Sequence, residues 1–264
     1  MIKTLPILFF IYFTLYTSAQ KCEYEEYFRF TDLAKKAFNT ENFKDARKSF
    51  KLAFKETIFP LGHDLSYALI AANETKDYEW AGQIAKKLAQ GGVPLRYFIR
   101  YKKKKWHKEF KSSFNSYNAY YEECFDQEMK KRLLQIEQND FEFTTKYHDW
   151  RARKIELQIQ ELIDGATKIV VDFKSFKEKY GFPNEREMGY NYIHIKNRIE
   201  PYKTDVLMVH IYQMGTPIFR NNIHDFACEG SLHTNFEEVI EKIQGFGDST
   251  GIEQEMRARY KKFR

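Results

Sequence analysis

The chain has few cysteines, and they fit neither a disulfide scaffold nor a metal centre. Its 264 residues include only Cys22, Cys124 and Cys228, too few for a disulfide-rich fold and not spaced as metal ligands. An exported protein could form one bridge and leave one free thiol. Cys22 and Cys124 are a tempting pair, but they fall at opposite ends of the helical repeats described below. Since a bridge needs Cα atoms within about 7 Å, no pairing is predicted.

Sequence motifs for metal, phosphate and nucleic-acid binding are also lacking. The chain contains no His-Glu-x-x-His, no histidine directly adjacent to a cysteine, and no glycine-rich phosphate loop followed by a helix. We therefore expect no metal and no cofactor. The net charge of +6 is mild, and the basic residues are scattered apart from 102–105 and the tail 257–264. A nucleic-acid-binding protein would show a basic face with aromatic platforms, so no nucleic-acid partner is expected.

Only the first residues form a long hydrophobic run. Lys3 gives a positive start, 5–16 are mostly apolar, and small residues precede a cleavage position after Ala19. This order is typical of a signal peptide, and the run is shorter than the roughly 20 residues that a membrane-spanning helix needs. We predict a signal peptide over 1–19, export to the periplasm or the extracellular space, and no membrane span after cleavage. The basic tail could contact an anionic membrane surface peripherally.

The whole chain, at 43% hydrophobic and 17% aromatic, is rich enough in apolar residues to form a packed core. Apolar residues recur at steps of three and four in four segments, about 24–39, 43–56, 64–74 and 78–90. Polar breaks separate the members of each pair, and Ala46 and Ala81, which follow corresponding turns, lie 35 residues apart. Such a period is typical of stacked helical hairpins, whose usual role is to hold another chain.

These segments resemble the tetratricopeptide repeat family. The residues that carry the resemblance are Phe30, Leu33, Ala34, Phe43, Ala46, Phe50 and Ala53 in the first copy, with Tyr78 and Ala81 in the second and a decayed third copy over 95–121. An ordinary helical hairpin bundle is the alternative. The resemblance implies a concave peptide-binding groove lined by the first helix of each pair, with the candidate residues Phe28, Thr31, Lys35, Phe38, Asn39, His63, Ser66, Ile70 and Asn73.

We divide the exported chain into helical repeats over 20–115, a long connecting helical region over 116–165 that ends at Gly165, and a helical C-terminal domain over 166–264. Strands at 168–171 or 206–211 are a minor alternative to helix. The C-terminal domain resembles a family of bacterial helical domains of unknown function. The matching pieces are Tyr180-Gly181-Phe182-Pro183, Gly189, Val209-His210 and Cys228-Glu229-Gly230. The family's upstream Asp-Gln-x-x-Arg motif is reduced here to Asp140 alone.

The expected fold class is therefore all-α, a short stack of hairpins followed by a helical domain. The predicted function is a protein-binding or peptide-binding module, or a scaffold, of the bacterial cell envelope. The alternative is a hydrolase of unknown specificity centred on His210, with help from the histidines nearer the C-terminus. Gly181, Pro183, Gly189 and His210 are the candidate residues of a C-terminal pocket. A histidine on an apolar helix face is more often a satisfied core residue than a catalytic one, so no catalytic residue is assigned.

Overall fold

The computed structural model describes residues 22–243, 254–256 and 258. The fold is all-α, as predicted, with one two-stranded sheet among the described residues. The predicted signal peptide and most of the basic tail lie outside the described residues. In the part that is described, no helix combines the length and the apolar character that crossing a membrane requires.

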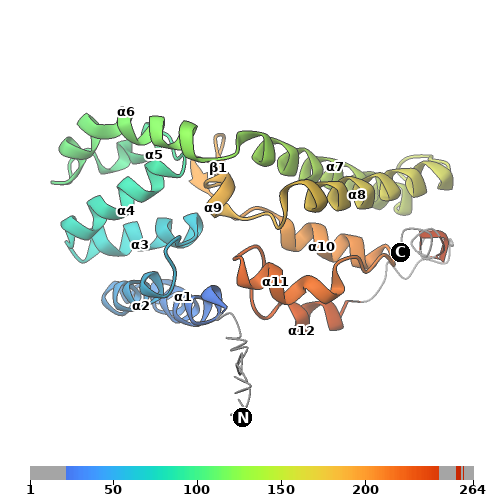
Figure 1. Cartoon of the computed structure of the whole chain (residues 1–264), viewed down its shortest axis with the longest axis horizontal. Helices are drawn as coiled ribbons and strands as arrows, with labels where there is room; N and C mark the ends of the chain where they lie inside the picture. Colours follow the sequence, from blue (N-terminus) through green and yellow to red (C-terminus); the bar gives the residue numbers. More distant parts are fainter. Residues whose placement is uncertain (1–21, 244–253, 257, 259–264) are drawn as a thin grey trace, which may run out of the picture.

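The first half begins with two stacked helical hairpins (Figure 1). They consist of α1 (Glu23–Asn39) with α2 (Phe43–Glu56), and α3 (Gly62–Glu74) with α4 (Tyr78–Gln90). Asn42 and Asp77 cap the second helix of each hairpin, since their side chains accept hydrogen bonds from the N–H groups of Asp45 and Trp80. The two equivalent turns predicted from the sequence therefore have equivalent caps.

The hairpins pack through alternating alanines and aromatic rings. Ala34, Ala46, Phe50 and Ala81 are fully buried, as the repeat pattern predicts. The prediction is wrong for Leu33, whose side chain is 47% exposed. α1 is the outermost helix and packs mainly against α2, so one flank of α1 faces solvent.

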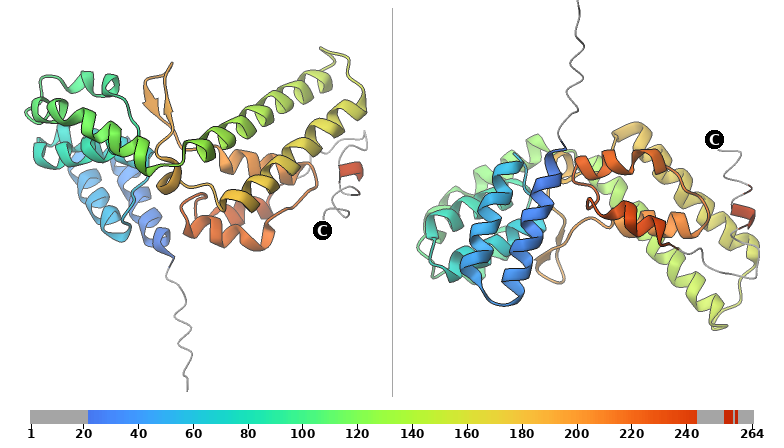
Figure 2. Two further views of the ribbon diagram at one scale, coloured as in Figure 1. Left: turned by 45° about the horizontal axis from the view of Figure 1, so that its top comes forward. Right: turned by 90° about the horizontal axis from the view of Figure 1, so that it is seen from below.

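The middle of the chain completes this half and leads into the second. α5 (Leu95–Phe98), the 3-10 helix η1 (Ile99–Tyr101) and α6 (His107–Cys124) cover α4, and α7 (Gln127–Arg151) pairs with α8 (Ile159–Tyr180). Figure 2 shows α7 and α8 as a long hairpin. The predicted helix end at Gly165 is wrong, because Gly165 lies inside α8, where an added Cβ would stand 3.0 Å from the ring of Phe143.

The C-terminal part follows this hairpin, and its last helices lie beneath it (Figure 1). It contains α9 (Glu185–Met188), the strands β1 (Tyr192–Ile193) and β2 (Arg198–Ile199), α10 (Thr204–Gln213), the 3-10 helix η2 (Arg220–Asn222), α11 (Ile223–Cys228) and α12 (Phe236–Glu241). The strands pair antiparallel, with Tyr192 opposite Ile199. Both segments named as alternative strands, 168–171 and 206–211, are helical.

A disulfide and several hydrogen bonds hold the two halves against each other. Cys22, directly before α1, forms a disulfide with Cys228 at the end of α11. The N–H of Gly62 donates to the carboxyl group of Glu185, and the N–H of Tyr190 donates to the carbonyl of Gly91. Cys124 is exposed and free. A disulfide of this kind is typical of an oxidising environment, such as that of exported proteins.

Candidate functional site

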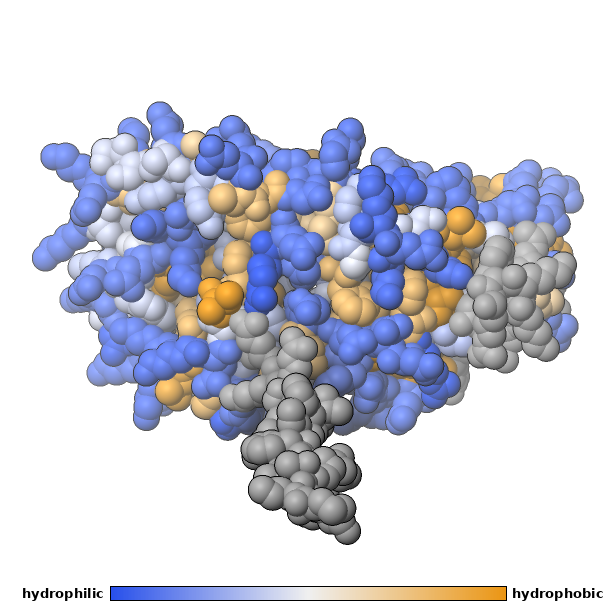
Figure 3. Space-filling view, in the orientation of Figure 1, coloured by the Kyte–Doolittle hydropathy of each residue, from blue (hydrophilic) through white to orange (hydrophobic). Residues whose placement is uncertain are grey.

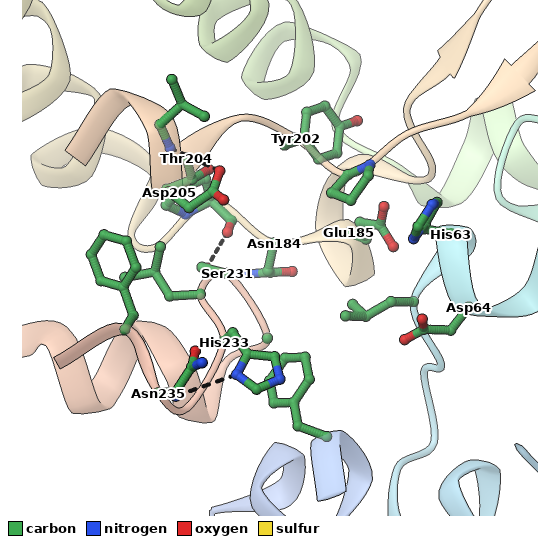
Figure 4. Close-up of a pocket in the computed structure, with 18 of the residues that line it drawn as sticks. His63, Asp64, Asn184, Glu185, Tyr202, Thr204, Asp205, Ser231, His233 and Asn235 are labelled. Atoms are coloured by element: carbon green, nitrogen blue, oxygen red, sulfur yellow. Dashed lines mark hydrogen bonds between the residues drawn. The ribbon is translucent and has the colours of Figure 1, made fainter. Parts of the chain in front are cut away.

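A cavity of about 380 Å³ lies where the two halves meet. Figure 4 shows that its walls come from separate parts of the chain, with His63 and Asp64 from the start of α3 and His233 and Asn235 from the segment before α12. Asn184 and Glu185 from the start of α9 lie between these two walls. We call this cavity the junction pocket.

Asp64 anchors the first wall of the junction pocket. Its side chain is 1% exposed, and its Oδ2 accepts a 2.7 Å hydrogen bond from the hydroxyl of Tyr27. Its other oxygen, Oδ1, lies 2.8 Å from the Nζ of Lys35. The Tyr27 hydroxyl also accepts the N–H of Leu61, so α1 and α3 are fixed to each other by this network. The charges of Asp64 and Lys35 therefore neutralise each other within the pocket.

Glu185 forms the base of the pocket in a different way. The Asn184 side chain caps α9 by accepting the N–H of Glu187 at 2.9 Å, which places Glu185 in the first turn. The Oε2 atom of Glu185 accepts the Gly62 N–H at 2.6 Å, and its buried Oε1 atom has no hydrogen-bond partner in the part of the chain that the structure describes. Burial raises the pKa of Glu185 to about 8, although the Gly62 hydrogen bond and the charge of Lys130 act to lower it. The group is therefore largely protonated at neutral pH when the pocket is empty.

The opposite wall is mostly apolar. The rings of Phe28 and His233 lie 4.5 Å apart between their centroids, and the hydroxyl of Ser231 donates to the carbonyl of Pro183. The apolar side chains that line the pocket are Phe28, Leu61, Pro183, Pro201, Val206, Val209, Leu232, Phe236 and Val239. A largely apolar concavity with a few polar groups at one side is the usual form of a ligand site.

A second, shallower depression of about 520 Å³ adjoins the pocket. The two share His63, Pro201, Tyr202 and Asp205, and the depression continues along α3 past Ser66 and Ile70. Burial lowers the pKa of His63, which favours a neutral ring. We call this depression the α3 groove.

The face of the molecule drawn in Figure 3 is mainly hydrophilic, with apolar side chains in patches between charged ones.

A separate cavity of about 220 Å³ lies between α7 and α10. There His210 Nδ1 lies 2.7 Å from Oδ2 of Asp140 and 3.3 Å from the hydroxyl of Thr144. Asp140 is 4% exposed, and its Oδ1 atom has no hydrogen-bond partner. Burial raises the pKa of the nearby Glu137 to about 7, opposed by a hydrogen bond from the Lys203 N–H.

The structure brings together about half of the groove residues named from the sequence. Phe28, Lys35 and His63 line the junction pocket, and His63, Ser66 and Ile70 line the α3 groove.

The other groove candidates lie elsewhere. Thr31 is buried and donates to the Phe28 carbonyl, and Phe38 packs against Tyr67. Asn73 is buried and binds the indole of Trp106, while Asn39 is exposed and lines neither cavity.

The structure does not bring the residues of the predicted C-terminal pocket together in one cavity. Pro183 lines the junction pocket, and His210 lines the cavity between α7 and α10. Gly181 and Gly189 line neither, and each has a positive φ, 80° and 72°. An added Cβ at Gly189 would lie 2.7 Å from the Gly91 carbonyl oxygen, so this glycine permits the close contact between the halves.

Sequence reasoning missed Asp64 as a pocket residue, as well as Glu185, Tyr202 and Asp205. None of these four residues belongs to a sequence motif that marks a binding residue. Among the described residues, no three His, Cys, Asp or Glu side chains are grouped to hold a metal ion.

Comparisons of the chain with models of protein families, with curated proteins and with solved structures find no match.

Proposed function

We propose that this protein is an exported binding module of the bacterial cell envelope, in the periplasm or outside the cell. It holds a peptide segment of a partner in the junction pocket and the adjoining α3 groove. The observation that carries this proposal is the junction pocket itself, a mostly apolar cavity of about 380 Å³ with buried carboxyl groups at one side. Preformed cavities of this kind are where proteins usually bind ligands.

The helical hairpins support a peptide as the ligand. Lys35 and Phe28 lie on α1, while His63, Ser66 and Ile70 lie on α3. These are the first helices of the two hairpins, the ones that the resemblance to tetratricopeptide repeats assigns to the groove. A pocket that continues into an open groove suits an extended chain with one anchored side chain or terminus.

Export is supported by two independent observations. The sequence begins with the pattern of a cleavable leader, and the Cys22–Cys228 disulfide is of the kind that persists in oxidising compartments. Cys22 lies three residues after the predicted cleavage position, so the bridge would form in the mature chain.

Blocking the pocket tests the proposal. We expect the mature chain to bind members of a fluorescent pentapeptide library, and Val209→Trp, at a half-buried position of the lining, to weaken that binding at least tenfold. Val171→Trp is the matched control, because Val171 is a 40% exposed valine of α8 outside this pocket. Anisotropy titrations measure the binding and circular dichroism verifies folding. Equal binding by the two folded variants would count against the proposal.

A second candidate function, a hydrolase, is favoured by the contact between Asp140 and His210. A carboxylate 2.7 Å from Nδ1 fixes the orientation and tautomer of the imidazole, which leaves Nε2 as a proton acceptor. This arrangement suits a general base that activates water. A panel of ester and amide substrates, combined with metal analysis, tests it. Turnover that His210→Ala abolishes would support the hydrolase, and absence of turnover, or equal turnover by the variant, would refute it.

A further inference from the structure

We propose that the junction pocket recognises a primary ammonium group of the bound peptide, at its amino terminus or on a lysine side chain, through Glu185 with help from Asp205. This inference rests on the proposed peptide binding and names the chemistry that the site selects. It is carried by the charge balance of the lining, by an unpartnered buried oxygen and by the apolar surroundings.

The lining has more acidic than basic groups. Lys35 is its one ammonium group, and Asp64 neutralises it at 2.8 Å. Glu185 and the exposed Asp205 also line the pocket, and neither forms an ion pair within 4 Å with a described residue. Two carboxyl groups therefore remain available to a positively charged ligand, which a pocket with low dielectric walls attracts strongly.

The Oε1 atom of Glu185 is the specific recognition point. Glu185 is 6% exposed, and the bond from Gly62 holds Oε2, so the side chain is fixed in place. Oε1 is buried without a hydrogen-bond partner among the described residues, and such an atom costs free energy unless a partner is supplied. Figure 4 shows the Glu185 carboxyl group within the ring of pocket side chains, beside His63. An ammonium group, which donates three hydrogen bonds, can satisfy Oε1 and still reach a second acceptor.

The rest of the pocket suits the carbon chain that carries the ammonium group. Val206, Val209 and Leu232 line it with apolar surface, together with the rings of Phe28 and Phe236. A lysine side chain, or the first residue of an apolar peptide, combines a hydrocarbon body with one charged end. A ligand carboxylate has no hydrogen to donate to Oε1 of Glu185, and the unpaired charge of Asp205 in the lining would repel it.

Binding of an ammonium group would release a proton. The pKa of Glu185 is about 8 in the empty pocket, mainly because of burial, and a cation beside the carboxylate lowers it. The charged groups that act on Glu185 are Asp64 from α3, which raises the pKa, and Lys130 from α7, which lowers it. His63 lines the same pocket, and its lowered pKa keeps it neutral near pH 7. Lys35 from α1 remains paired with Asp64.

The experiment makes two comparisons with pentapeptides of leucine and valine that carry one lysine. The first compares the free lysine with the same lysine acetylated. The second compares a free amino terminus with an acetyl-capped one. Isothermal titration calorimetry with the mature chain at pH 7, in buffers of different ionisation enthalpy, gives affinity and proton release. We expect the peptide with a free amine to bind at least about tenfold more tightly than its acetylated form. Its binding should release about one proton. Glu185→Gln should lose both the preference and the proton release, whereas Glu123→Gln, an exposed glutamate of α6, should keep both.

The outcomes separate this inference from the proposed function. Equal affinity for amine and acetylated peptides, with binding still blocked by Val209→Trp, would overturn the recognition of an ammonium group and leave peptide binding intact. A preference for the amine that Glu185→Gln retains would also overturn the role of Glu185. If neither form of any peptide binds, the proposed function fails and this inference fails with it.

Discussion

The backbone N–H of Gly62 lies 2.6 Å from Oε2 of Glu185, across 123 residues of sequence. This hydrogen bond joins the first turn of α3 to the first turn of α9. It also places a carboxyl group in a fully buried position at the junction of the two halves. The same contact therefore contributes to the fold and to the candidate site, and it makes the stability of the protein depend on pH.

Glu185 should make the protein less stable as the pH rises from about 4.5 to about 8. The ordinary pKa of 4.5 applies in the unfolded chain, and burial raises the folded-state pKa of Glu185 to about 8. Between these values the folded state binds more protons than the unfolded state, so stability falls with rising pH by up to about 1.4 kcal/mol per pH unit. Glu137, with its pKa raised by burial to about 7, acts in the same direction.

Urea unfolding at a series of pH values measures this dependence. Glu185→Gln mimics the protonated group and should flatten the slope, with its stability advantage over the natural protein greatest near pH 8. Glu123→Gln should leave the slope unchanged, since Glu123 is exposed. Parallel pH profiles for the natural protein and Glu185→Gln would show that Glu185 titrates normally.

The disulfide between Cys22 and Cys228 should stabilise the mature chain substantially. It joins residues 206 apart in sequence and so restricts a long loop of the unfolded chain. Cys22→Ser or Cys228→Ser should cost about 2–5 kcal/mol. Cys124→Ser is the control, because Cys124 is exposed and free, and it should have little effect. Unfolding with and without reductant gives the difference, and peptide mass mapping that finds Cys22 as a free thiol in the native protein would contradict the pairing.

The elements that the sequence predicted best are those with a local cause. The helices of the first two hairpins follow from apolar residues at steps of three and four, and their turns from Asn42 and Asp77, which cap the helices that follow. Gly165 was misread because a glycine usually marks a helix end, whereas here it admits the ring of Phe143 between two packed helices. That requirement is visible only once α7 and α8 are paired.

The candidate site depended on contacts that no local pattern encodes. Phe28, Lys35 and His63 could be named because the resemblance to tetratricopeptide repeats assigns the first helix of each hairpin to a groove. Glu185 stands in a short polar segment between Pro183 and Gly189, and only its packing against Gly62 makes it a buried acid. Asp140 and His210 are 70 residues apart, and no local sequence pattern links one to the other.

Asn73 and Asn39, both named as groove residues, should behave differently on substitution. Asn73 is 2% exposed, and its Oδ1 accepts the Trp106 indole N–H at 3.1 Å while its Nδ2 donates to the Leu69 carbonyl. Asn73→Ala leaves that indole N–H without its partner and should cost about 1–3 kcal/mol of stability. Asn39 is exposed, so Asn39→Ala should change stability by no more than about 0.5 kcal/mol. Neither change should alter peptide affinity once folding is verified, and a selective loss of affinity in Asn73→Ala would place that residue in the groove after all.

Any side chain at position 91 should destabilise the protein, because it would clash with the ring of Tyr190. Gly91 follows α4 with φ −94°, a backbone conformation open to other residues. Any loss of stability in Gly91→Ala therefore comes from a steric clash rather than from backbone strain. An added Cβ would stand 2.3 Å from two atoms of the Tyr190 ring, and Tyr190 is fixed there by its N–H bond to the Gly91 carbonyl. Gly91→Ala should therefore destabilise the protein by about 1–3 kcal/mol. In a Tyr190→Leu background the ring is absent and the same change should cost much less, which a double-mutant cycle by urea unfolding measures. Strict additivity of the two changes would show that the ring of Tyr190 does not pack against α4, and with it would go the contact that aligns the two halves around the junction pocket.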